Sequence, residues 1–428
     1  MPVSSARAAA FDILLRVETT EAYASELLHS TRMAALSPAD HGLATEIAMG
    51  VLRWRSVLDA RVGMHANKPV EKFDMEVITA LRIGAYQLAF LDRIPPHAAI
   101  NESVELVKRA RKRSAAGMVN AVLRKMKPFA DLNPLEAHPD WVIERWTAIY
   151  GRKATADICA YDQQAPHAVI RADQALVQEL ESEGIGLEPG KLLSNAHIVS
   201  HGDITRTRAF REKRLVLQDE GSQLVALLLG RGEQILDCCA APGGKARILA
   251  EASPEAIVLA MELHPHRAAL MRRLVTTPNV HIVAADARTM PFDRRFDRIL
   301  ADVPCTGTGT LARNPEIKWR LRFEDIERLQ AYQVEILSQA MRRVRPGGRL
   351  VYSSCSLEPE ENEAVVKQAL QKSAHFRLVD IRDRLAELRQ QGTLVCSPDS
   401  LVRGPYLRTI PGVHPCDGFF AGLLEPEM

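Results

Sequence analysis

The chain has 428 residues, of which 46% are hydrophobic and 25% charged, and its formal net charge is +2. This composition predicts a globular protein of two or three domains, and the absence of any apolar run near ~18 residues excludes a membrane span. Asp12 interrupts the only apolar patch near the start, residues 8–15, which argues against a signal peptide and favours the cytoplasm. The seven cysteines include no C-x-x-C pair, so we expect neither a disulfide framework nor a bound metal.

The first third of the chain is expected to be helical. Apolar residues recur at helical spacing, and Ser37-Pro38-Ala39-Asp40 supplies an N-cap, a proline at the first helical position and an acid in the first turn. The expected helices span residues 6–29, 39–60, 74–91, 98–113 and 115–127. Because no strand alternation appears before residue 166, these segments predict an all-α domain.

Cations are concentrated at the end of this helical part. The basic cluster comprises Lys108, Arg109, Arg111, Lys112, Arg113, Arg124, Lys125 and Lys127, with no acid between the first and the last. A nucleic-acid backbone would relieve the mutual repulsion of these charges, and its counterions would be released. The alternative is a solvated face whose cations stabilise two helix C-termini.

Two sequence blocks relate this helical part to a known fold. LRIGAYQLAFLDRIPPHAAINESVELVKR at 81–109 and MVNAVLRKM at 118–126 resemble the NusB-type antitermination fold, an RNA-binding helical domain. The resemblance spans most of residues 5–130. It implies a NusB-like RNA-binding domain, which we bound at residues 1–138.

A small α+β linker domain is expected next, over residues 139–214. We predict a helix at 139–163, a strand at 167–171 and a helix at 174–183 that Gly184 ends, and no element is assigned between 187 and 203. A second basic cluster follows in Arg206, Arg208, Arg211, Lys213 and Arg214, with one acid, Glu212. The cluster is either an extension of an RNA track or a solvated linker, and the residues alone do not decide.

Strands and helices alternate from residue 216 onward. The expected strands are residues 234–237, 257–262, 280–284, 296–301, 349–353, 376–380 and 418–424, and the main expected helices are 265–274, 323–344 and 359–372. This alternation predicts an α/β, Rossmann-like domain over residues 215–428, with a mostly parallel sheet covered on both faces. Ligands of such sheets bind at the carboxyl ends of the strands.

The block ILDCCAAPGGK at 235–245 combines a strand, a glycine turn and the start of a helix. Glycines let a ligand approach the backbone, and the helix N-terminus offers free N–H groups. An ordinary βα turn is the alternative, while a P-loop is excluded because Cys239 and Ala246 stand where glycine and Ser or Thr are needed. Glu262 and Asp286 follow the next two strands and suit a ribose and an adenine, although either acid might instead cap a helix.

Two cysteines end the next two strands. Cys305 follows Asp302 after the fourth strand, and Cys355 follows the fifth, and these strands are usually neighbours in a doubly wound sheet. We therefore expect both thiols in one crevice beside an adenosine-type cofactor. The alternatives are buried core cysteines and a redox pair, for which no dithiol motif is present.

Two thiols at such a site suggest a particular chemistry. A thiolate that adds to C6 of a pyrimidine makes C5 nucleophilic enough to take the methyl group of S-adenosylmethionine. Asp302 would hydrogen-bond N3 and the amino group of a cytosine. The second cysteine would assist release of the product, and the residues alone do not say which cysteine has which role.

Five blocks carry a resemblance to one enzyme family. CAAPGGK, DVPCTGTGTLARNPEIKWR, YSSCSLEPEENE, FREKRLVLQDEGSQ and DGFFAGLL resemble the NOL1/NOP2/Sun family of RNA cytosine-C5 methyltransferases, with coverage from about 140 to 426. Together with the NusB-like part, the chain is similar to the bacterial Sun/RsmB branch, which methylates small-subunit (16S) ribosomal RNA.

The family implies roles for individual residues. Cys355 would be the nucleophile, Cys305 would serve product release, and Asp302 would act beside them. S-adenosylmethionine would be held by Cys239, Ala240, Ala241, Pro242, Gly243, Gly244, Lys245, Glu262, Asp286 and Asp302. Cys238, Val303, Ser354 and Glu262 depart from the commoner family residues, and none of these departures removes a reactive group; Cys238 is expected to be a small packing residue.

We therefore expect a monomeric enzyme that methylates a cytosine of 16S ribosomal RNA. The same chemistry on transfer RNA or DNA is an alternative. A non-catalytic RNA-binding assembly factor is another, and binding of S-adenosylmethionine would discriminate it from an enzyme.

Overall fold

The computed structural model describes residues 3–127, 132–373 and 375–427, apart from the side chain of Arg32. The chain forms two compact units. The helical unit comprises Met1–Ala165 with Leu311–Arg320, and the methyltransferase-like unit comprises Pro166–Thr310 with Leu321–Met428. The three-domain division at residues 138 and 214 stays a prediction, because these two units divide the chain at other positions.

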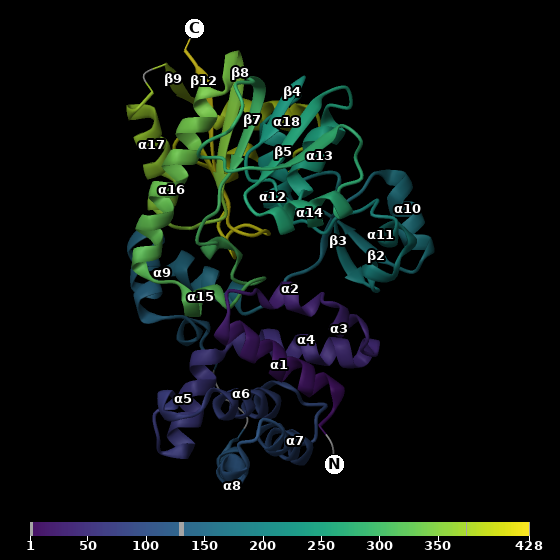
Figure 1. Cartoon of the computed structure of the whole chain (residues 1–428), viewed down its shortest axis with the longest axis vertical. Coiled ribbons are helices and arrows are strands. Elements are labelled where there is room, and N and C mark those ends of the chain that lie inside the picture. Colours follow the sequence, from purple (N-terminus) through teal and green to yellow (C-terminus); the bar gives the residue numbers. More distant parts are fainter. Residues whose placement is uncertain (1–2, 128–131, 374, 428) are drawn as a thin grey trace. The chain divides into compact units, whose positions relative to one another are not determined.

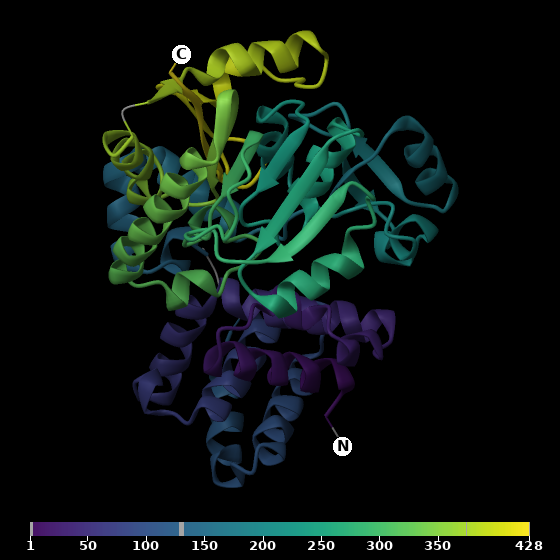
Figure 2. The ribbon, with the colours of Figure 1, turned by 45° about the horizontal axis from the view of Figure 1, so that its top comes forward.

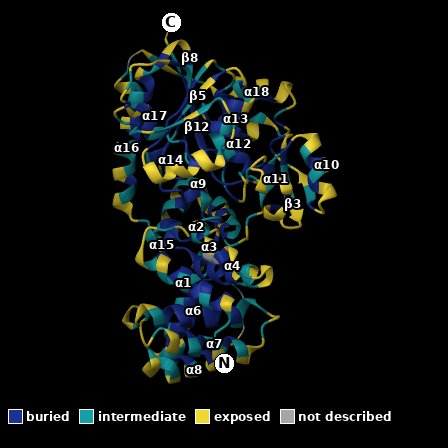
Figure 3. Ribbon diagram, turned by 45° about the vertical axis from the view of Figure 1, so that its right-hand side comes forward, coloured by how far each residue is buried: buried dark blue, intermediate teal, exposed yellow. Residues whose placement is uncertain are grey.

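The helical unit is all-α as far as the structure describes it, as predicted (Figure 1). Its helices are α1 (Ser5–Thr19), α2 (Ala24–Leu28), α3 (Thr31–Ala34), α4 (Pro38–Arg53), α5 (Arg55–Ala66), α6 (Met75–Phe90), α7 (Pro96–Arg109), α8 (Ala116–Lys125) and α9 (Asp140–Asp162). The 3-10 turns are η1 (Val70–Lys72), η2 (Arg113–Ala115) and η3 (Pro134–Ala137). Helix α6 lies in the middle of the core and buries Leu81, Ile83 and Ala85 completely, as its dark colour in Figure 3 shows.

Three local predictions for this unit can be checked. The N-cap of α4 is confirmed, because the Asp40 backbone N–H donates to Ser37 Oγ at 3.1 Å. The expected continuous helix over 6–29 is wrong, since the backbone turns extended at Thr20, whose Oγ1 accepts from the Ala22 N–H. The segment up to residue 60 is likewise two helices, which meet at Trp54.

The segment Leu311–Arg320 completes the helical unit although it follows Cys305 closely in sequence. It carries the short helix α15 (Ile317–Arg320). Lys318 Nζ donates to the carbonyl of Arg53 at 3.0 Å, and Trp319 Nε1 donates to the carbonyl of Leu52 at 2.7 Å. Glu316 Oε1 accepts from the Ala24 N–H at 2.6 Å, so the segment is hydrogen-bonded to both α2 and the end of α4.

The methyltransferase-like unit begins with a small antiparallel sheet in the order β1-β3-β2. Its elements are β1 (Val169–Arg171), α10 (Gln174–Ser182), β2 (Gly186–Pro189), β3 (Ala196–His201), η4 (Ile204–Arg206) and α11 (Arg208–Arg211). Strands β2 and β3 lie in the stretch to which the sequence assigned no element. Most of their residues are only partly buried or exposed, so the alternation that marks a half-buried strand is weak.

The main sheet has the order β10-β11-β12-β8-β7-β4-β5-β6, with β9 paired to β12. Its strands are β4 (Gln234–Asp237), β5 (Ile257–Glu262), β6 (Val280–Ala284), β7 (Phe296–Asp302), β8 (Val344–Ser354), β9 (Phe376–Val379), β10 (Val402–Arg403), β11 (Tyr406–Arg408) and β12 (Phe420–Pro426). Strands β6, β5, β4, β7 and β8 run parallel to one another. Figure 2 shows the arrows of the sheet side by side. The predicted Rossmann-like, parallel arrangement is confirmed for these five strands, whereas β12 pairs antiparallel with β8, β9 and β11, so the sheet as a whole is mixed.

Helices cover both faces of this sheet. The remaining helical elements are α12 (Glu220–Leu228), α13 (Gly244–Ala252), α14 (Pro265–Leu274), η5 (Thr308–Thr310), α16 (Phe323–Arg342), η6 (Pro359–Glu361), α17 (Glu363–Gln371), α18 (Ile381–Gln390) and η7 (Pro398–Leu401). Leu224, Ile248 and Leu385 of α12, α13 and α18 share one core cluster, whereas Val334 and Val365 of α16 and α17 belong to another. In the part of the chain that the structure describes, no helix is apolar over enough turns to span a bilayer.

Candidate active site

The carboxyl ends of four parallel strands bring most of the predicted site residues to one edge of the sheet. Asp237 ends β4, Glu262 ends β5 and Asp302 ends β7. Cys355 directly follows β8, which pairs in parallel with β7 as the sequence predicted for the fourth and fifth strands. Strand β4 lies between β5 and β7, and this reversal of strand order is where ligands of such sheets bind.

The glycine turn after β4 has the backbone that its sequence requires. Gly243 has φ +110°, a left-handed conformation, and a Cβ at this position would come within 2.4 Å of Val275 Cγ2. Helix α13 starts at Gly244, two residues earlier than the sequence predicted. Cys238 is buried in the core, in line with the packing role expected for it, and Cys239 is partly exposed.

Asp237 is a site residue that the sequence analysis did not select. Its side chain is 1% exposed, and neither carboxylate oxygen has a well-formed hydrogen bond to a described residue. Burial and the nearby charge of Asp302 raise the pKa of Asp237 to about 7. A buried carboxylate without partners at a ligand-binding edge suits a cationic donor from a bound molecule. Its position as the first acid after the strand was the available sequence signal.

Lys245 and Asp302 form an ion pair between the glycine turn and β7. Lys245 Nζ lies 2.6 Å from Asp302 Oδ2, while Asp302 Oδ1 accepts from Ser353 Oγ at 2.7 Å. Burial alone would lower the pKa of Lys245, but the charge and hydrogen bond of Asp302, together with Cys355 and Asp237, raise it overall. The ammonium also stands 5.4 Å from the ring centre of Phe419 and interacts with Cys355.

The other two predicted acids, Glu262 and Asp286, differ in how many hydrogen bonds they already accept from the protein. Glu262 is 4% exposed and accepts from the His264 N–H at 2.9 Å. Asp286 accepts from the backbone N–H of Arg288 at 2.9 Å and from its guanidinium at 2.7 Å, and these bonds hold the pKa of Asp286 below its usual value. Residues 287–289 form a turn, so the alternative role of Asp286 as a helix N-cap is wrong.

The two predicted cysteines are adjacent. Cys305 Sγ lies 3.2 Å from Cys355 Sγ, and both side chains are partly exposed. The hydrogen bond with Cys355, together with burial, raises the pKa of Cys305 well above that of an ordinary thiol. The Gly309 N–H donates to the carbonyl of Cys355 at 2.9 Å, and a Cβ on Gly309 would stand 2.8 Å from that oxygen. Glycine at 309 therefore permits the two cysteine loops to touch.

Ion pairs with acidic side chains compensate part of the basic cluster of the helical unit. Lys108 pairs with Glu105 at 2.7 Å, Arg109 with Asp12 at 2.9 Å and Lys112 with Asp74 at 2.9 Å. The expectation that all eight cations lack compensation is therefore wrong, because Glu105 of the same helix reaches Lys108, and acids of other segments reach Arg109 and Lys112. Five other members of the cluster are exposed: Arg111, Arg113, Arg124, Lys125 and Lys127.

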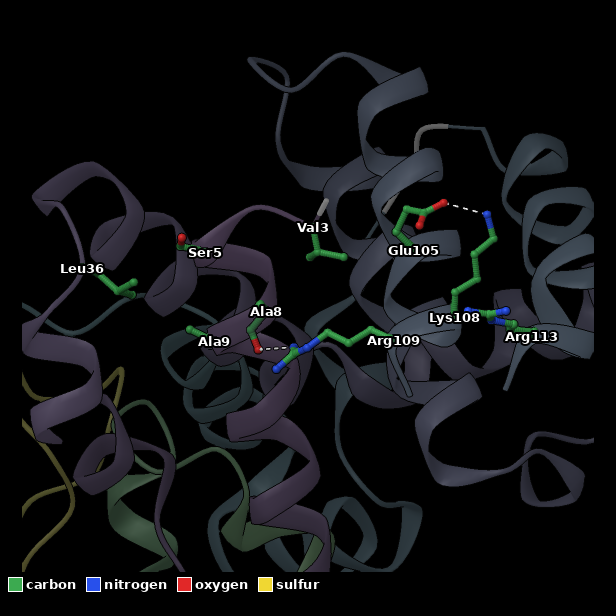
Figure 4. Close-up of a pocket in the computed structure, with 9 residues that line it drawn as sticks. All are labelled: Val3, Ser5, Ala8, Ala9, Leu36, Glu105, Lys108, Arg109 and Arg113. Carbon is green, nitrogen blue, oxygen red and sulfur yellow. Dashed lines mark hydrogen bonds and ion pairs between the residues drawn. The ribbon is translucent and has the colours of Figure 1, made fainter. Parts of the chain in front are cut away.

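A pocket of about 690 Å³ lies between α1 and α7 of the helical unit (Figure 4). Lys108, Arg109 and Arg113 line it, and Arg109 donates to the carbonyl of Ala8. The second basic cluster is an exposed ion-pair network, in which Arg208 pairs with Glu212 at 2.7 Å. Across the described residues, no three His, Cys, Asp or Glu side chains gather in an arrangement that would hold a metal ion.

Comparisons with known proteins match two separate parts of the chain. Residues 224–425 match the family model described as 16S rRNA methyltransferase RsmB/F, and residues 4–128 match the NusB family. A probable ribosomal RNA small subunit methyltransferase B of Bacillus subtilis is 33% identical, with 98% of each chain covered. Ribosomal RNA small subunit methyltransferase B of Vibrio cholerae is 32% identical, covering 99% of this chain and 98% of its own.

Two solved structures share the fold. The crystal structure of PH0851 is 23% identical and covers 99% of both chains, with a TM-score of 0.81. NSun6 from Pyrococcus horikoshii, solved with SFG, is 20% identical and covers 67% of this chain and 98% of its own, with a TM-score of 0.57.

Proposed function

Because the chain belongs to the RsmB/F family of 16S rRNA methyltransferases, we propose that it methylates C5 of a cytosine in small-subunit ribosomal RNA through a cysteine–C6 bond. The observation that carries this proposal is the pair of thiols, 3.2 Å apart, at the ends of neighbouring strands. They stand beside the Lys245–Asp302 ion pair of the glycine turn.

The cofactor is S-adenosylmethionine, whose sulfonium supplies an electrophilic methyl group when it is bound. The residues present fit it. The Gly243-Gly244 turn leaves its backbone open to a ligand, and the unpartnered carboxylate of Asp237 suits the cofactor's amino group. Glu262 suits the ribose hydroxyls. Asp286 would offer an acceptor to the adenine only where Arg288 moves away, because its carboxylate is already engaged.

We assign the nucleophile to Cys355. Cys305 is disfavoured as the nucleophile because the neighbouring sulfur, burial and the charge of Glu361 all raise its pKa. This agrees with the order of roles that the family resemblance implies.

Each residue then has one part in the reaction. Cys355 Sγ, as a thiolate, bonds to C6, and the electron pair of the C5–C6 double bond moves to C5. C5 then takes the methyl group, whose bond to the sulfonium sulfur would break and leave its electron pair on that sulfur. The C5 proton leaves to water, the C5–C6 double bond reforms, and Cys355 departs with the electrons of its bond to C6. The protonated Cys305 thiol, 3.2 Å away, donates a hydrogen bond to the departing sulfur.

Asp302 would orient the base and is itself held in place. Each of its oxygens already accepts one hydrogen bond, from Ser353 and from Lys245. A carboxylate has about four acceptor positions, so it can also accept from the amino group of a cytosine. The basic cluster and the pocket lined by Lys108, Arg109 and Arg113 would contact the RNA backbone. We place the enzyme in the cytoplasm as a monomer, where its RNA is made.

The test is bisulfite sequencing of 16S ribosomal RNA after incubation with the purified enzyme and S-adenosylmethionine. The wild type is expected to protect one cytosine, and Cys355→Ala is expected to lose at least about 10³-fold in rate, as for other deleted nucleophiles. Cys305→Ala is expected to accumulate a protein–RNA complex that survives a denaturing gel. A complex with Cys355→Ala instead would reverse the two roles, and methylated transfer RNA without methylated ribosomal RNA would refute the substrate.

A further inference from the structure

We propose that Glu361 is a positioning residue that joins the two cysteine loops and thereby sets the distance between Cys305 and Cys355. This inference rests on the proposed function, because the distance matters for release of the methylated base. Glu361 is the last residue of the 3-10 turn η6 and is 0% exposed. It is distinct from the residues assigned above to the base, to the cofactor or to the covalent bond.

The carboxylate of Glu361 accepts hydrogen bonds from both loops. One oxygen accepts from the backbone N–H of Thr306 at 2.9 Å, and the other accepts from the Thr306 hydroxyl. That second oxygen also accepts from the hydroxyl of Ser356. Thr306 directly follows Cys305 and Ser356 directly follows Cys355, so one buried group fixes the residue after each thiol.

The residue before Cys305 is fixed through the same carboxylate. Gln333 of α16 donates through Nε2 to Glu361 Oε1 at 2.8 Å and to the carbonyl of Pro304 at 2.9 Å. Cys305 is thus held on both sides by groups that converge on Glu361. The hydroxyl of Tyr352 also donates to the backbone carbonyl of Glu361, which ties η6 to strand β8.

The residue after Glu361 holds the Cys355 loop independently. Asn362 Oδ1 accepts from Ser354 Oγ, and Asn362 Nδ2 donates to the carbonyl of Ser356 at 2.9 Å. Glu361 connects this loop to the loop of Cys305. The loops also meet directly where the Thr306 and Ser356 hydroxyls lie 3.0 Å apart and the Leu357 N–H donates to Thr308 Oγ1 at 2.8 Å. The main-chain bond from Gly309 to Cys355 also joins the loops, so loss of the Glu361 carboxylate would loosen the pair of loops without separating them.

Burying a carboxylate at this position costs folding free energy, which argues that the group has a specific role. Burial raises the pKa of Glu361, and the hydrogen bonds from Ser356 and Thr306 offset the rise only in part. Replacement by alanine would leave the Thr306 N–H buried without an acceptor, and the hydroxyls of Thr306 and Ser356 would keep only each other and Thr308 as partners, so the loops would shift. Glutamine keeps an acceptor oxygen and the same length, so Glu361→Gln is expected to preserve the spacing.

The first measurement is the rate at which the two thiols oxidise to a disulfide, and it does not depend on RNA or cofactor. A diazene dicarboxamide such as diamide takes up two electrons and two protons from the thiols and becomes a hydrazine. We expect Glu361→Ala to slow Cys305–Cys355 disulfide formation about tenfold, and Glu361→Gln to stay within roughly twofold of wild type. Mass spectrometry of the linked peptides gives the rate. Glu360→Ala, which removes the adjacent carboxylate of η6, is the matched control.

The second measurement is the covalent protein–RNA complex on a denaturing gel. Glu361→Ala is expected to accumulate this complex as Cys305→Ala does, while Glu361→Gln turns over without it. A purely structural defect would lower the amount of folded protein and would not trap the RNA. Thr306→Val, which removes one hydroxyl donor and keeps the side-chain volume, replaces Glu361→Ala should the latter not fold.

The outcomes separate this inference from the proposed function. An unchanged disulfide rate in Glu361→Ala overturns the positioning role. A slower disulfide rate with a complex in Cys305→Ala but none in Glu361→Ala overturns the link to release. A slower rate with no complex in either variant refutes the proposed release step and supports the positioning role on its own.

Discussion

Glu361 of the methyltransferase-like unit and Lys318 of the helical unit are both charged groups buried among polar neighbours, and those neighbours satisfy them to different degrees. In the methyltransferase-like unit Glu361 accepts from three side chains and one backbone N–H. In the helical unit Lys318 is 2% exposed and donates to the carbonyl of Arg53. Burial lowers the pKa of Lys318 to about 7, and attraction to Asp162 offsets this only in part.

The two buried groups differ in how many of the hydrogen-bonding atoms around them have partners. Asp162 accepts from His138 at 3.2 Å, yet its other oxygen and the Nε of Arg53 have no hydrogen bond to any described residue. Burial also lowers the pKa of His138. A dense set of donors holds a buried charge in one geometry, which suits a reaction site, whereas an incompletely satisfied set titrates near neutral pH. Lys318 therefore makes the helical unit sensitive to pH, whereas Glu361 is held in place by its hydrogen bonds.

Lys318→Met is expected to remove the largest pH effect on stability. The pKa of Lys318 is lowered on folding, so the unfolded chain binds the extra proton between about pH 7 and 10.5, and wild-type stability rises with pH there. The rise is about 1.4 kcal/mol per pH unit, or about 3 kcal/mol from pH 7 to 9. Urea unfolding followed by tryptophan fluorescence checks it, with exposed Lys153→Met as control. Equal slopes in wild type and Lys318→Met would refute the comparison.

Asp237→Asn is expected to stabilise the folded protein and to weaken its binding of S-adenosylmethionine. Because the folded pKa is raised to about 7, the contribution of Asp237 to stability is present below pH 4 and is lost as the pH rises through 7. We expect a gain of roughly 2 kcal/mol at pH 8 and no gain at pH 4. Thermal unfolding at both pH values measures this. Equilibrium binding should show an affinity for S-adenosylmethionine that is at least about tenfold lower. An unchanged affinity would exclude Asp237 from the cofactor site.

Gly309→Ala is expected to disturb the contact between the cysteine loops. The added Cβ would stand 2.4 Å from the carbonyl oxygen of Gly418 and 2.8 Å from that of Cys355, and both are backbone atoms. Such overpacking costs about 1–2 kcal/mol and displaces the loops. The variant should lower kcat more than it raises KM, because the added Cβ displaces the loop that carries Cys355. Gly347→Ala is the control for an added methyl group, since nothing lies within 4 Å of that position, although its positive φ adds some strain.

Arg124→Ala and Lys125→Ala are expected to have the smallest effect of these variants, a modest loss of RNA affinity and of its salt dependence. Each exposed cation that contacts a phosphate should reduce the slope of log affinity against log salt by about 0.7–0.9 on ribosomal RNA. Lys108→Ala, which removes a cation already paired with Glu105, should change the slope less. Filter binding at several salt concentrations compares them. The same slope for all three variants would show that pairing does not decide which cations contact RNA.

The central strands of the main sheet were predictable because they are mostly apolar segments. Residues 234–237, 257–262 and 280–284 fit this pattern, and their predicted bounds match β4, β5 and β6, of which β4 and β5 are largely buried and β6 is half-exposed. Strands β2, β3, β10 and β11 are short or half-exposed and gave no such pattern. The expected helix over 359–372 is η6 followed by α17, since Asn362 leaves helical geometry in order to hold the Cys355 loop.

The candidate site was predictable where function resides in strand ends, and less so where it depends on contacts between distant residues. Adjacency of Cys305 and Cys355 followed from the expected neighbouring strands, and the sulfur–sulfur contact confirms it. The engagement of Asp286 by Arg288 and the missing partners of Asp237 depend on side-chain packing, which periodicity does not encode. The part played by Glu361 was hidden for the same reason, since its partners lie 5 to 55 residues away.

The place of Leu311–Arg320 in the helical unit has a consequence for biosynthesis. Its hydrogen bonds span 259 to 303 residues of sequence, and Leu311, Glu316 and Lys318 lie in the interior of that unit. A chain emerging from the ribosome folds from its N-terminus, so the first unit would wait, with part of its interior missing, until residue 320 has been translated. Because contacts so distant in sequence form slowly, the two units are expected to mature together, and an isolated fragment of residues 1–165 should expose apolar surface and associate with chaperones.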